Sequence, residues 1–391
     1  MNRRRFLATG GAYGALLAAG VARAEAPWTA PPRFVRPAQP TDEGGLWALM
    51  DREEARLRRS PFVLRDPTLG DYLQDIACRL ALNHCPDIRV YVVQTPIFNA
   101  SMAPNGMLQI WTGLLLRVDN EAQLAAVIGH EIGHYLARHS VERMREVKSR
   151  AAFGQLLGLL GAVGSAGQLV GVVGQLALLA SGFAYSRDQE READRIATML
   201  MRTAGYDPGE AAKIWGNLRL EIKAGTEGEP ARSSPMLATH PSPGERQETL
   251  ERLAESGHGG VLNEELWRER MRPFTPEWLT AEVKRGRHEE SLALLSRKIA
   301  QSPARADFLY ARGEVYRLRA SDEDLNAALA DFQAAVGVGG EPPETHRGLG
   351  LIYRKQGRLP EARASLIRYL ESAPAAPEAS MIKSYVEELR I

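Results

Sequence analysis

The 391-residue sequence predicts a mainly α-helical domain with a small β-sheet, followed by an all-α repeat domain. Three observations carry this prediction. Helical apolar periodicity dominates residues 44–272, a β-branched strand pattern and a hairpin pattern lie within residues 87–113, and the sequence repeats itself after residue 273. With 44% hydrophobic residues, 25% charged residues and a net charge of +1, no basic face dominates. This balance argues against nucleic acid as a partner.

The N-terminus has the organisation of an export signal over residues 1–24. Three consecutive arginines precede an apolar run, and "ARA" before Glu25 fits a cleavage site. The arginines followed by "FL" predict a twin-arginine signal and therefore a periplasmic protein. An ordinary secretory signal and a retained membrane anchor are the alternatives. Residues 25–43 are rich in proline and predict an extended linker.

Residues 44–111 alternate between helix and strand signals. "GLWALMDREEARLRR" and "LGDYLQDIACRLALN" have helical periodicity, and "DIRVYVVQT" alternates as a strand does. "NASMAPNGMLQIWTG" predicts a hairpin that turns at Asn105-Gly106. Pro104 disfavours a central strand, so we expect one of these two strands at a sheet edge.

The two cysteines, Cys78 and Cys85, are the only ones in the chain. In an oxidising periplasm they would form a local disulfide that ties a helix end to the next strand. A pair of buried reduced thiols is the alternative.

The stretch "AAVIGHEIGHYLARHS" carries the clearest chemical motif. His130 and His134 are four residues apart and would share one face of a helix, so that both rings reach one metal ion. Glu131 is rotated by about 100° from His130, in the position of a general base that acts on water at the metal. His139 would project about 140° from His134 on a continuous helix, which predicts a structural or exposed role. A zinc site needs a third protein ligand as well.

The third ligand is expected in "SRDQEREADR". Glu190 and Asp194 would share a helix face, with Ala193 small enough to allow another helix close by. Glu192 would point away from this face into solvent.

Residues 151–185 contain no charged side chain. They predict glycine-rich helices that are buried against the motif helix or lie on the membrane surface, so a peripheral membrane contact is expected there. A membrane span, and with it a membrane-embedded protease, is the alternative.

The C-terminal residues 273–391 resemble a small tetratricopeptide-like solenoid. Gly313 and Tyr316 correspond to Gly350 and Tyr353, and a weaker copy precedes them. The separation of these matching residues exceeds the tetratricopeptide period of about 34 residues, and the segment "RASDED" accounts for the additional residues. Such a solenoid offers a concave face to a protein partner.

Taken together, these motifs resemble the M48 family of zinc metallopeptidases. The resemblance lies in "FNASMAPNG", "TGLL", "AQLAAVIGHEIGHYLARHS", "YSRDQEREADRIA" and "THPSPGER". It implies a zincin-type α+β peptidase domain over residues 44–272. It also implies one Zn²⁺ per chain, with the following roles: His130, His134 and Glu190 as ligands, Glu131 as general base, Asp194 and Arg246 as supporting residues, and His240 as a group that either stabilises the oxyanion or caps the zinc.

We therefore expect a periplasmic endopeptidase that degrades misfolded or unassembled envelope proteins. The substrate would bind as an extended strand along an edge strand formed by Asn99, Ala100, Ser101 and Met102. The repeats would bind a protein partner, which the resemblance places in the outer-membrane assembly machinery. The alternative is a latent or inactive peptidase fold that acts as a chaperone or scaffold through its repeats.

Overall fold

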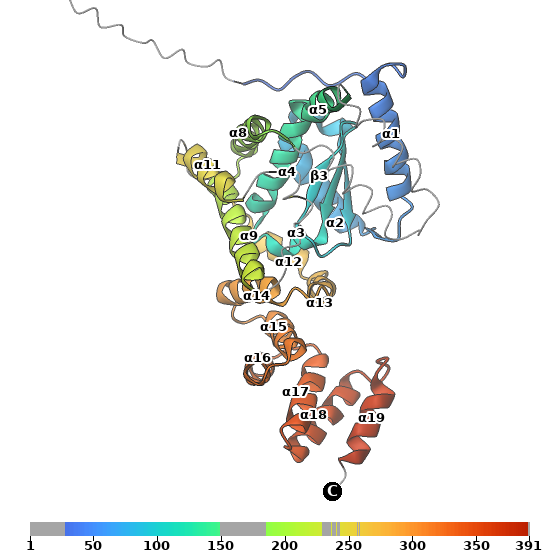
Figure 1. The fold of residues 1–391 in the computed structure, drawn as a ribbon, viewed down its shortest axis with the longest axis vertical. Helices are drawn as coiled ribbons and strands as arrows, with labels where there is room; N and C mark the ends of the chain where they lie inside the picture. Colours follow the sequence, from blue (N-terminus) through green and yellow to red (C-terminus); the bar gives the residue numbers. More distant parts are fainter. Residues whose placement is uncertain are drawn as a thin grey trace, which may run out of the picture. The chain divides into compact units, whose positions relative to one another are not determined.

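The computed structural model describes residues 28–148, 185–228, 236, 240, 243–255, 257 and 259–389 (Figure 1). The export signal predicted at 1–24 lies outside these residues. So do the uncharged stretch up to residue 184 and most of the loop that precedes His240. Within the described parts of the chain, no helix is both long enough and apolar enough to span a membrane.

A four-stranded sheet organises the first domain. Its strands are β1 (Val63–Leu64), β2 (Arg89–Val93), β3 (Ala100–Met102) and β4 (Met107–Trp111), in the order β1-β2-β4-β3. β2 and β4 are parallel, and the two outer pairs are antiparallel. The hairpin prediction is confirmed. Gly106 at its turn has a φ of +90°, which favours glycine. β3 is the edge strand that Pro104 predicted.

Helices cover both faces of this sheet (Figure 1). α1 (Asp42–Leu57) packs on one face, where Leu49 and Leu57 meet Val93 and Trp111 in a buried cluster. α2 (Pro67–Ala81) and α4 (Glu121–Leu136) contact strands from the other side. The other α-helices that the structure describes before the repeats are α3 (Thr112–Arg117), α5 (His139–Lys148), α8 (Arg187–Thr203), α9 (Gly209–Gly228), α11 (Pro243–Glu255) and α12 (Glu264–Met271).

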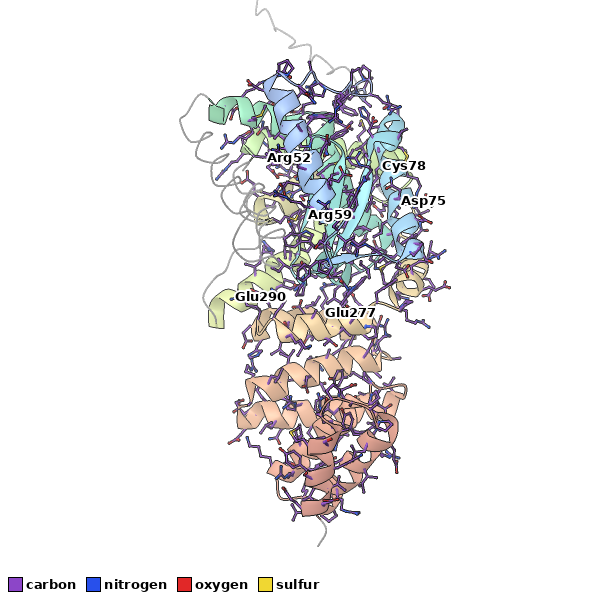
Figure 2. All side chains as sticks on the ribbon, turned by 90° about the vertical axis from the view of Figure 1, so that its right-hand side faces the viewer. Arg52, Arg59, Asp75, Cys78, Glu277 and Glu290 are labelled. Atoms are coloured by element: carbon purple, nitrogen blue, oxygen red, sulfur yellow. A yellow bond between two sulfur atoms is a disulfide. The ribbon has the colours of Figure 1, made fainter. Side chains whose placement is uncertain are left out.

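A disulfide joins Cys78 to Cys85. Cys78 lies on α2 (Figure 2), and Cys85 lies in the 3₁₀ helix Leu82–Asp87 that connects α2 to β2. The bond therefore closes the turn between the helix and the 3₁₀ segment that leads into the sheet.

In the linker predicted at 25–43, the described residues from 28 onward form no helix or strand before α1, but part of this segment packs against the domain. Arg33 forms an ion pair with Asp87, and Pro31 O lies 2.9 Å from His84 Nε2. The ring of Phe34 makes edge contacts with His84 and Tyr135. This part of the linker is thus fastened by specific contacts.

Glu54 fastens α1 to the sheet. Its carboxylate accepts two hydrogen bonds of 2.6 Å from the Arg89 guanidinium, and others from Tyr91 and Asn105. Burial alone would raise the pKa of Glu54, but the hydrogen bonds from Arg89 and Tyr91 lower it to about 2. The charged form is therefore the one that the fold stabilises.

The repeats begin with α13 (Thr275–Lys284) and α14 (His288–Gln301). Two further helical pairs and a last helix follow: α15 (Ala306–Arg319), α16 (Asp322–Val338), α17 (Glu344–Lys355), α18 (Leu359–Ser372) and α19 (Ala379–Glu388). Gly313 and Gly350, which correspond to each other in the two copies, have the same packing role. A Cβ at Gly313 would lie 2.7 Å from Phe332, and one at Gly350 would lie 2.5 Å from Leu366. Each glycine thus allows the second helix of its pair to approach closely.

Buried ion pairs join the first repeat helices to the sheet domain. Arg117 on α3 donates to Glu221 on α9 and to Glu282 on α13, at 2.7 and 3.0 Å. Arg297 and Lys298 on α14 both donate to Asp119, which directly precedes the N-cap of α4. We call these six residues the ionic junction.

Replacing Glu54 by Gln should lower the free energy of unfolding at pH 7 by about 1–3 kcal/mol, because the charged hydrogen bonds to Arg89 are lost. Since its folded pKa lies below the unfolded one, the wild-type advantage exists above pH 4.5 and is lost as the pH falls towards 2. Denaturant unfolding at pH 7 and pH 3 measures both effects. Glu53→Gln is the control, because the one ion pair of Glu53 among the described residues is with Arg56 of its own helix. Equal losses in the two variants would contradict the tie to the sheet.

Candidate metal centre

α4 presents both histidines of the motif to the interior. The side chain of Asn120 caps its first turn by accepting from Gln123 N, and all of its residues are buried. A helix that is buried on every side is stable only inside a domain. His130 and His134 are each 1% exposed and lie one turn apart on the same face.

α8 supplies the carboxylates. A capping box formed by Ser186 and Gln189 starts the helix, and Glu190 and Asp194 then lie one turn apart on its buried side. Gly133 of α4 allows α8 to come close, since a Cβ on this residue would lie 2.9 Å from Ala193 O. The small residue expected at position 193 is therefore part of a tight helix–helix contact.

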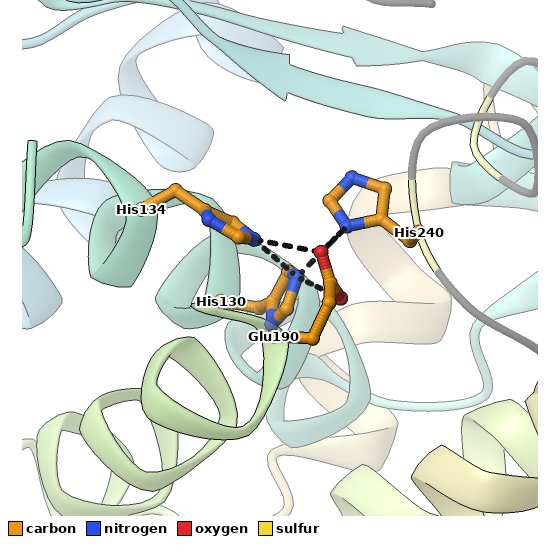
Figure 3. Close-up of side chains that lie close together, drawn as sticks. All are labelled: His130, His134, Glu190 and His240. Carbon is orange, nitrogen blue, oxygen red and sulfur yellow. Dashed lines mark hydrogen bonds and ion pairs between the residues drawn. The ribbon is translucent and has the colours of Figure 1, made fainter. Parts of the chain in front are cut away.

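Four side chains converge where these helices meet (Figure 3). One ligand atom from each of His130, His134, Glu190 and His240 lies within 4.8 Å of the others, and all four residues are buried. His130 Nε2 lies 3.0 Å from His134 Nε2 and 3.2 Å from His240 Nδ1. Glu190 Oε1 lies 3.3 Å from His134 Nε2 and 2.7 Å from His240 Nδ1.

This donor set fits a metal ion. Ligands at about 2.0–2.2 Å in a tetrahedron are about 3.3–3.6 Å apart, close to most of the observed separations. The outer nitrogens of His130 and His134 are occupied by other partners, so their inner lone pairs face one another across the site. Among the described residues, the second carboxylate oxygen of Glu190 accepts no hydrogen bond although it is buried. A cation between these atoms satisfies all of them.

Asp194 and Arg246 stand behind His130. The Nδ1 of His130 lies 2.9 Å from Asp194 Oδ1, so it carries the hydrogen and donates to the carboxylate. Arg246 Nη2 also lies 2.7 Å from this nitrogen, but two donors cannot bond, and the guanidinium instead donates to Asp194. Burial alone would raise the pKa of Asp194, but Arg246 and His130 lower it. Arg246 also stacks on Trp215 of α9, with Cζ 3.8 Å from the ring centroid.

Glu131 lies beside the cluster and is not one of the four residues in it. Its Oε2 accepts from Met102 N at 3.2 Å, and its Oε1 lies 3.7 Å from His240 Nε2. Burial raises the pKa of Glu131, although the ring of His240 opposes that shift. A buried carboxylate with a raised pKa is a stronger base than a solvated one.

Of the four residues predicted to form the edge strand, only Ala100 and Met102 direct main-chain groups away from the sheet. The main chains of Asn99 and Ala103 bond β4, and Ser101 lies opposite Gln109. Because bonding alternates along an antiparallel strand, Ala100 and Met102 direct their main-chain groups away from β4. The N–H of Met102 is already committed to Glu131.

The prediction for His139 was wrong in its geometry. The helix ends at Leu136, and Arg138 with a φ of +58° turns the chain, so the angle on a continuous helix does not apply. His139 is buried with its Nδ1 2.8 Å from His134 Nδ1, and its Nε2 lies 3.4 Å from Glu192. Tyr185, the first residue of the "YSRDQEREADRIA" stretch, to which no role was assigned, stacks on His134 at 3.8 Å. No residue before His139 signals this break in the sequence, because Ala137 and Arg138 are good helix formers.

Comparison with known proteins agrees with this site. The model of peptidase family M48 matches residues 64–254, and a tetratricopeptide repeat model matches residues 317–377. The beta-barrel assembly-enhancing protease of Yersinia pestis is 26% identical over 84% of this chain and 74% of its own length. The mitochondrial metalloendopeptidase OMA1 of Arabidopsis thaliana is 33% identical over 45% of this chain and 34% of its own length. The putative beta-barrel assembly-enhancing protease of Vibrio cholerae is 28% identical over 49% and 40%.

The chain therefore carries a domain that matches peptidase family M48, followed by tetratricopeptide repeats. The match with the Yersinia pestis protease extends over both parts. Against the Vibrio cholerae and Arabidopsis thaliana relatives, the chain spans less than half of their length.

Replacing Gly133 by Ala should weaken metal binding by about tenfold or more, because its Cβ would force α8 away and move Glu190 from the histidines. Gly129→Ala is the matched control on the same helix, since its Cβ would lie 3.5 Å from Ala197, an ordinary contact. Both variants gain the same helix propensity, so the difference isolates the clash. Zinc affinity measured by competition with a chelator decides it, and equal affinities would contradict this role of Gly133.

Proposed function

We propose that this chain is a periplasmic zinc-dependent endopeptidase that hydrolyses peptide bonds of misfolded or unassembled envelope proteins. The single observation that carries the proposal is the convergence of His130, His134 and Glu190 in a buried cluster with Glu131 beside it. Two imidazoles and one carboxylate are the ligand set of many catalytic zinc sites, and a neighbouring glutamate is their usual base. We assign one Zn²⁺ per chain to this site.

A zinc ion held there would polarise the scissile carbonyl and lower the pKa of a water molecule next to it. Glu131 would take the proton of the attacking water on Oε1, the oxygen that has no hydrogen bond among the described residues. The N–H of Met102 fixes the other oxygen, so that the carboxylate keeps one orientation. Glu131 would then pass the proton to the leaving amine.

The substrate would bind as an extended strand beside β3. Ala100 offers its N–H and C=O groups, and Met102 offers its C=O, because these groups point away from β4. Main-chain recognition of this kind tolerates varied side chains, which suits the degradation of unfolded segments. Asn99 and Ser101 would support the strand from its paired side.

We further propose that His240 holds the enzyme latent. Its Nδ1 is 3.2 Å from His130 Nε2 and 2.7 Å from Glu190, so it takes the fourth position around the proposed ion. A catalytic zinc site keeps this position open for water and substrate. The arrangement supports capping over the oxyanion role. Activity would then require His240 to leave.

The proposed compartment rests on the predicted twin-arginine signal and is supported by the disulfide between Cys78 and Cys85, since such bonds persist in oxidising environments. We propose domain limits at 44–272 and 273–391. The repeats would bind a protein partner, and the names of the relatives support one in outer-membrane barrel assembly. Peripheral membrane contact through residues 151–185 remains part of the proposal.

The second candidate is a chaperone or scaffold built on a closed peptidase fold. The observation in its favour is the position of His240, which closes the site. The two functions differ in their need for Glu131. A scaffold keeps its cellular role in a Glu131→Gln variant, whereas a protease loses it.

In purified full-length chain, Glu131→Gln should reduce hydrolysis of casein by about 100-fold or more, because the general base is removed. Its zinc content should stay at one ion per chain, since Glu131 is not a ligand in our assignment. Peptide release and metal analysis on the same samples test both statements. Equal cleavage by the two proteins would refute the assignment of the base.

His240→Ala should increase casein hydrolysis by about 10- to 100-fold, the gain expected when a competent state that is populated at about 1–10% becomes dominant. The comparison is with wild type at equal zinc content. A loss of activity in His240→Ala would instead assign His240 to the oxyanion and remove the latency proposal.

A further inference from the structure

His139 forms the only described contact at the outer nitrogen of His134. Its Nδ1 lies 2.8 Å from His134 Nδ1, and both rings are buried. On its other side, Nε2 lies 3.4 Å from a carboxylate oxygen of Glu192, whose side chain is 45% exposed. The three residues form a chain from the metal-binding cluster to the surface of α8.

The hydrogens along this chain can be assigned. His134 points Nε2 at the cluster, so that nitrogen must carry a lone pair and Nδ1 must carry the hydrogen. His139 Nδ1 must then accept, which leaves the hydrogen of His139 on Nε2, directed at Glu192. Each of the two rings therefore has one tautomer that satisfies every contact.

The two histidines of the motif are thus held by different means. His130 donates directly to Asp194, a buried carboxylate reinforced by Arg246. Among the described residues, His134 has no carboxylate at its outer nitrogen and donates to a neutral ring instead. In both arrangements the carboxylate comes from α8: Asp194 contacts His130 directly, and Glu192 contacts His139.

A second contact fixes the plane of His134. Tyr185 stacks on the ring with an interplanar angle of 16°, and its hydroxyl lies 2.9 Å from Ser140 Oγ. Ser140 directly follows His139, so the first turn of α5 supports both the tautomer and the plane of this ring. His139 itself is absent from the cluster of four ligand residues.

We propose that His139 is a positioning residue of the metal centre, whose Nδ1 accepts a hydrogen bond from Nδ1 of His134 and whose Nε2 donates one to Glu192. Resting on the proposed zinc site, this inference adds a residue that keeps His134 in the tautomer and direction that bind metal. The role requires a hydrogen-bond acceptor at the position of His139 Nδ1. It does not require an imidazole.

The test compares His139→Leu with His139→Asn in the full chain. The two replacements have nearly the same shape, but only the Asn amide oxygen can accept at the former position of Nδ1. His139→Leu should bind zinc about 10- to 100-fold more weakly in competition with a chelator, as expected when a supporting partner of a ligand histidine is lost. His139→Asn should stay within about threefold of wild type, and the visible spectrum of its cobalt-loaded form should remain that of wild type.

Two controls frame the result. His346→Gln removes a histidine that is likewise paired with a glutamate, Glu341 at 2.9 Å, but lies in the repeats, and it should leave zinc affinity unchanged. His130→Ala removes a proposed ligand. If wild type binds zinc no better than His130→Ala, the proposed zinc site fails, and this inference fails with it.

If His130→Ala loses zinc while His139→Leu keeps wild-type affinity, only the positioning role is overturned. Equal losses in His139→Leu and His139→Asn would overturn it too, because they would indicate a packing role. Should His139→Leu not fold, the half-exposed Glu192 offers a second pair. Glu192→Met should then weaken zinc binding by about two- to fivefold and Glu192→Gln less. Equal zinc affinities of Glu192→Met and Glu192→Gln would overturn the proposed chain of hydrogen bonds from His134 through His139 to Glu192.

Discussion

The close contact of α4 with α8 is the constraint on which the site depends. Glu190 reaches the two histidines because Gly133 lets Ala193 approach the backbone of α4. The same approach brings Asp194 to His130. Burying several carboxylates so near one another is costly, and the cost is offset only by opposite charge. Arg246 supplies part of that charge, and the donor set indicates a metal ion for the rest.

Features set by spacing within one helix or hairpin were predictable from the sequence. Four residues make one helical turn, so His130 with His134, and Glu190 with Asp194, had to share faces wherever the helices lay. Asn105-Gly106 fixed the hairpin for the same kind of reason, because its turn needs a positive φ. The meeting of the two helices was not dictated by spacing. It was expected from the family resemblance and from the small residue at position 193.

Features that depend on a break in a helix or on distant contacts could not be predicted. His139 was placed by extending a helix that ends three residues earlier, and the backbone turn at Arg138 brings it to His134 instead. The contacts of Phe34 with His84 and Tyr135 join segments whose sequences carry no shared pattern. The sequence left two roles open for His240, oxyanion stabilisation and capping of the metal. The choice between them depends on the distance of its ring from Glu190, which sequence spacing does not give.

Through the ionic junction, the first two repeat helices contribute charged partners to residues of the first domain. Asp119 stands directly before the cap of the metal-binding helix, and its partners, Arg297 and Lys298, come from α14. Arg117, only 3% exposed, depends likewise on Glu282 of α13. A chain cut at the linear boundary near residue 273 would remove both cationic partners of Asp119 and would leave Arg117 with Glu221 alone. The boundary visible in the sequence is therefore a poor place to excise a working fragment, and the peptidase is best handled with its first repeat attached.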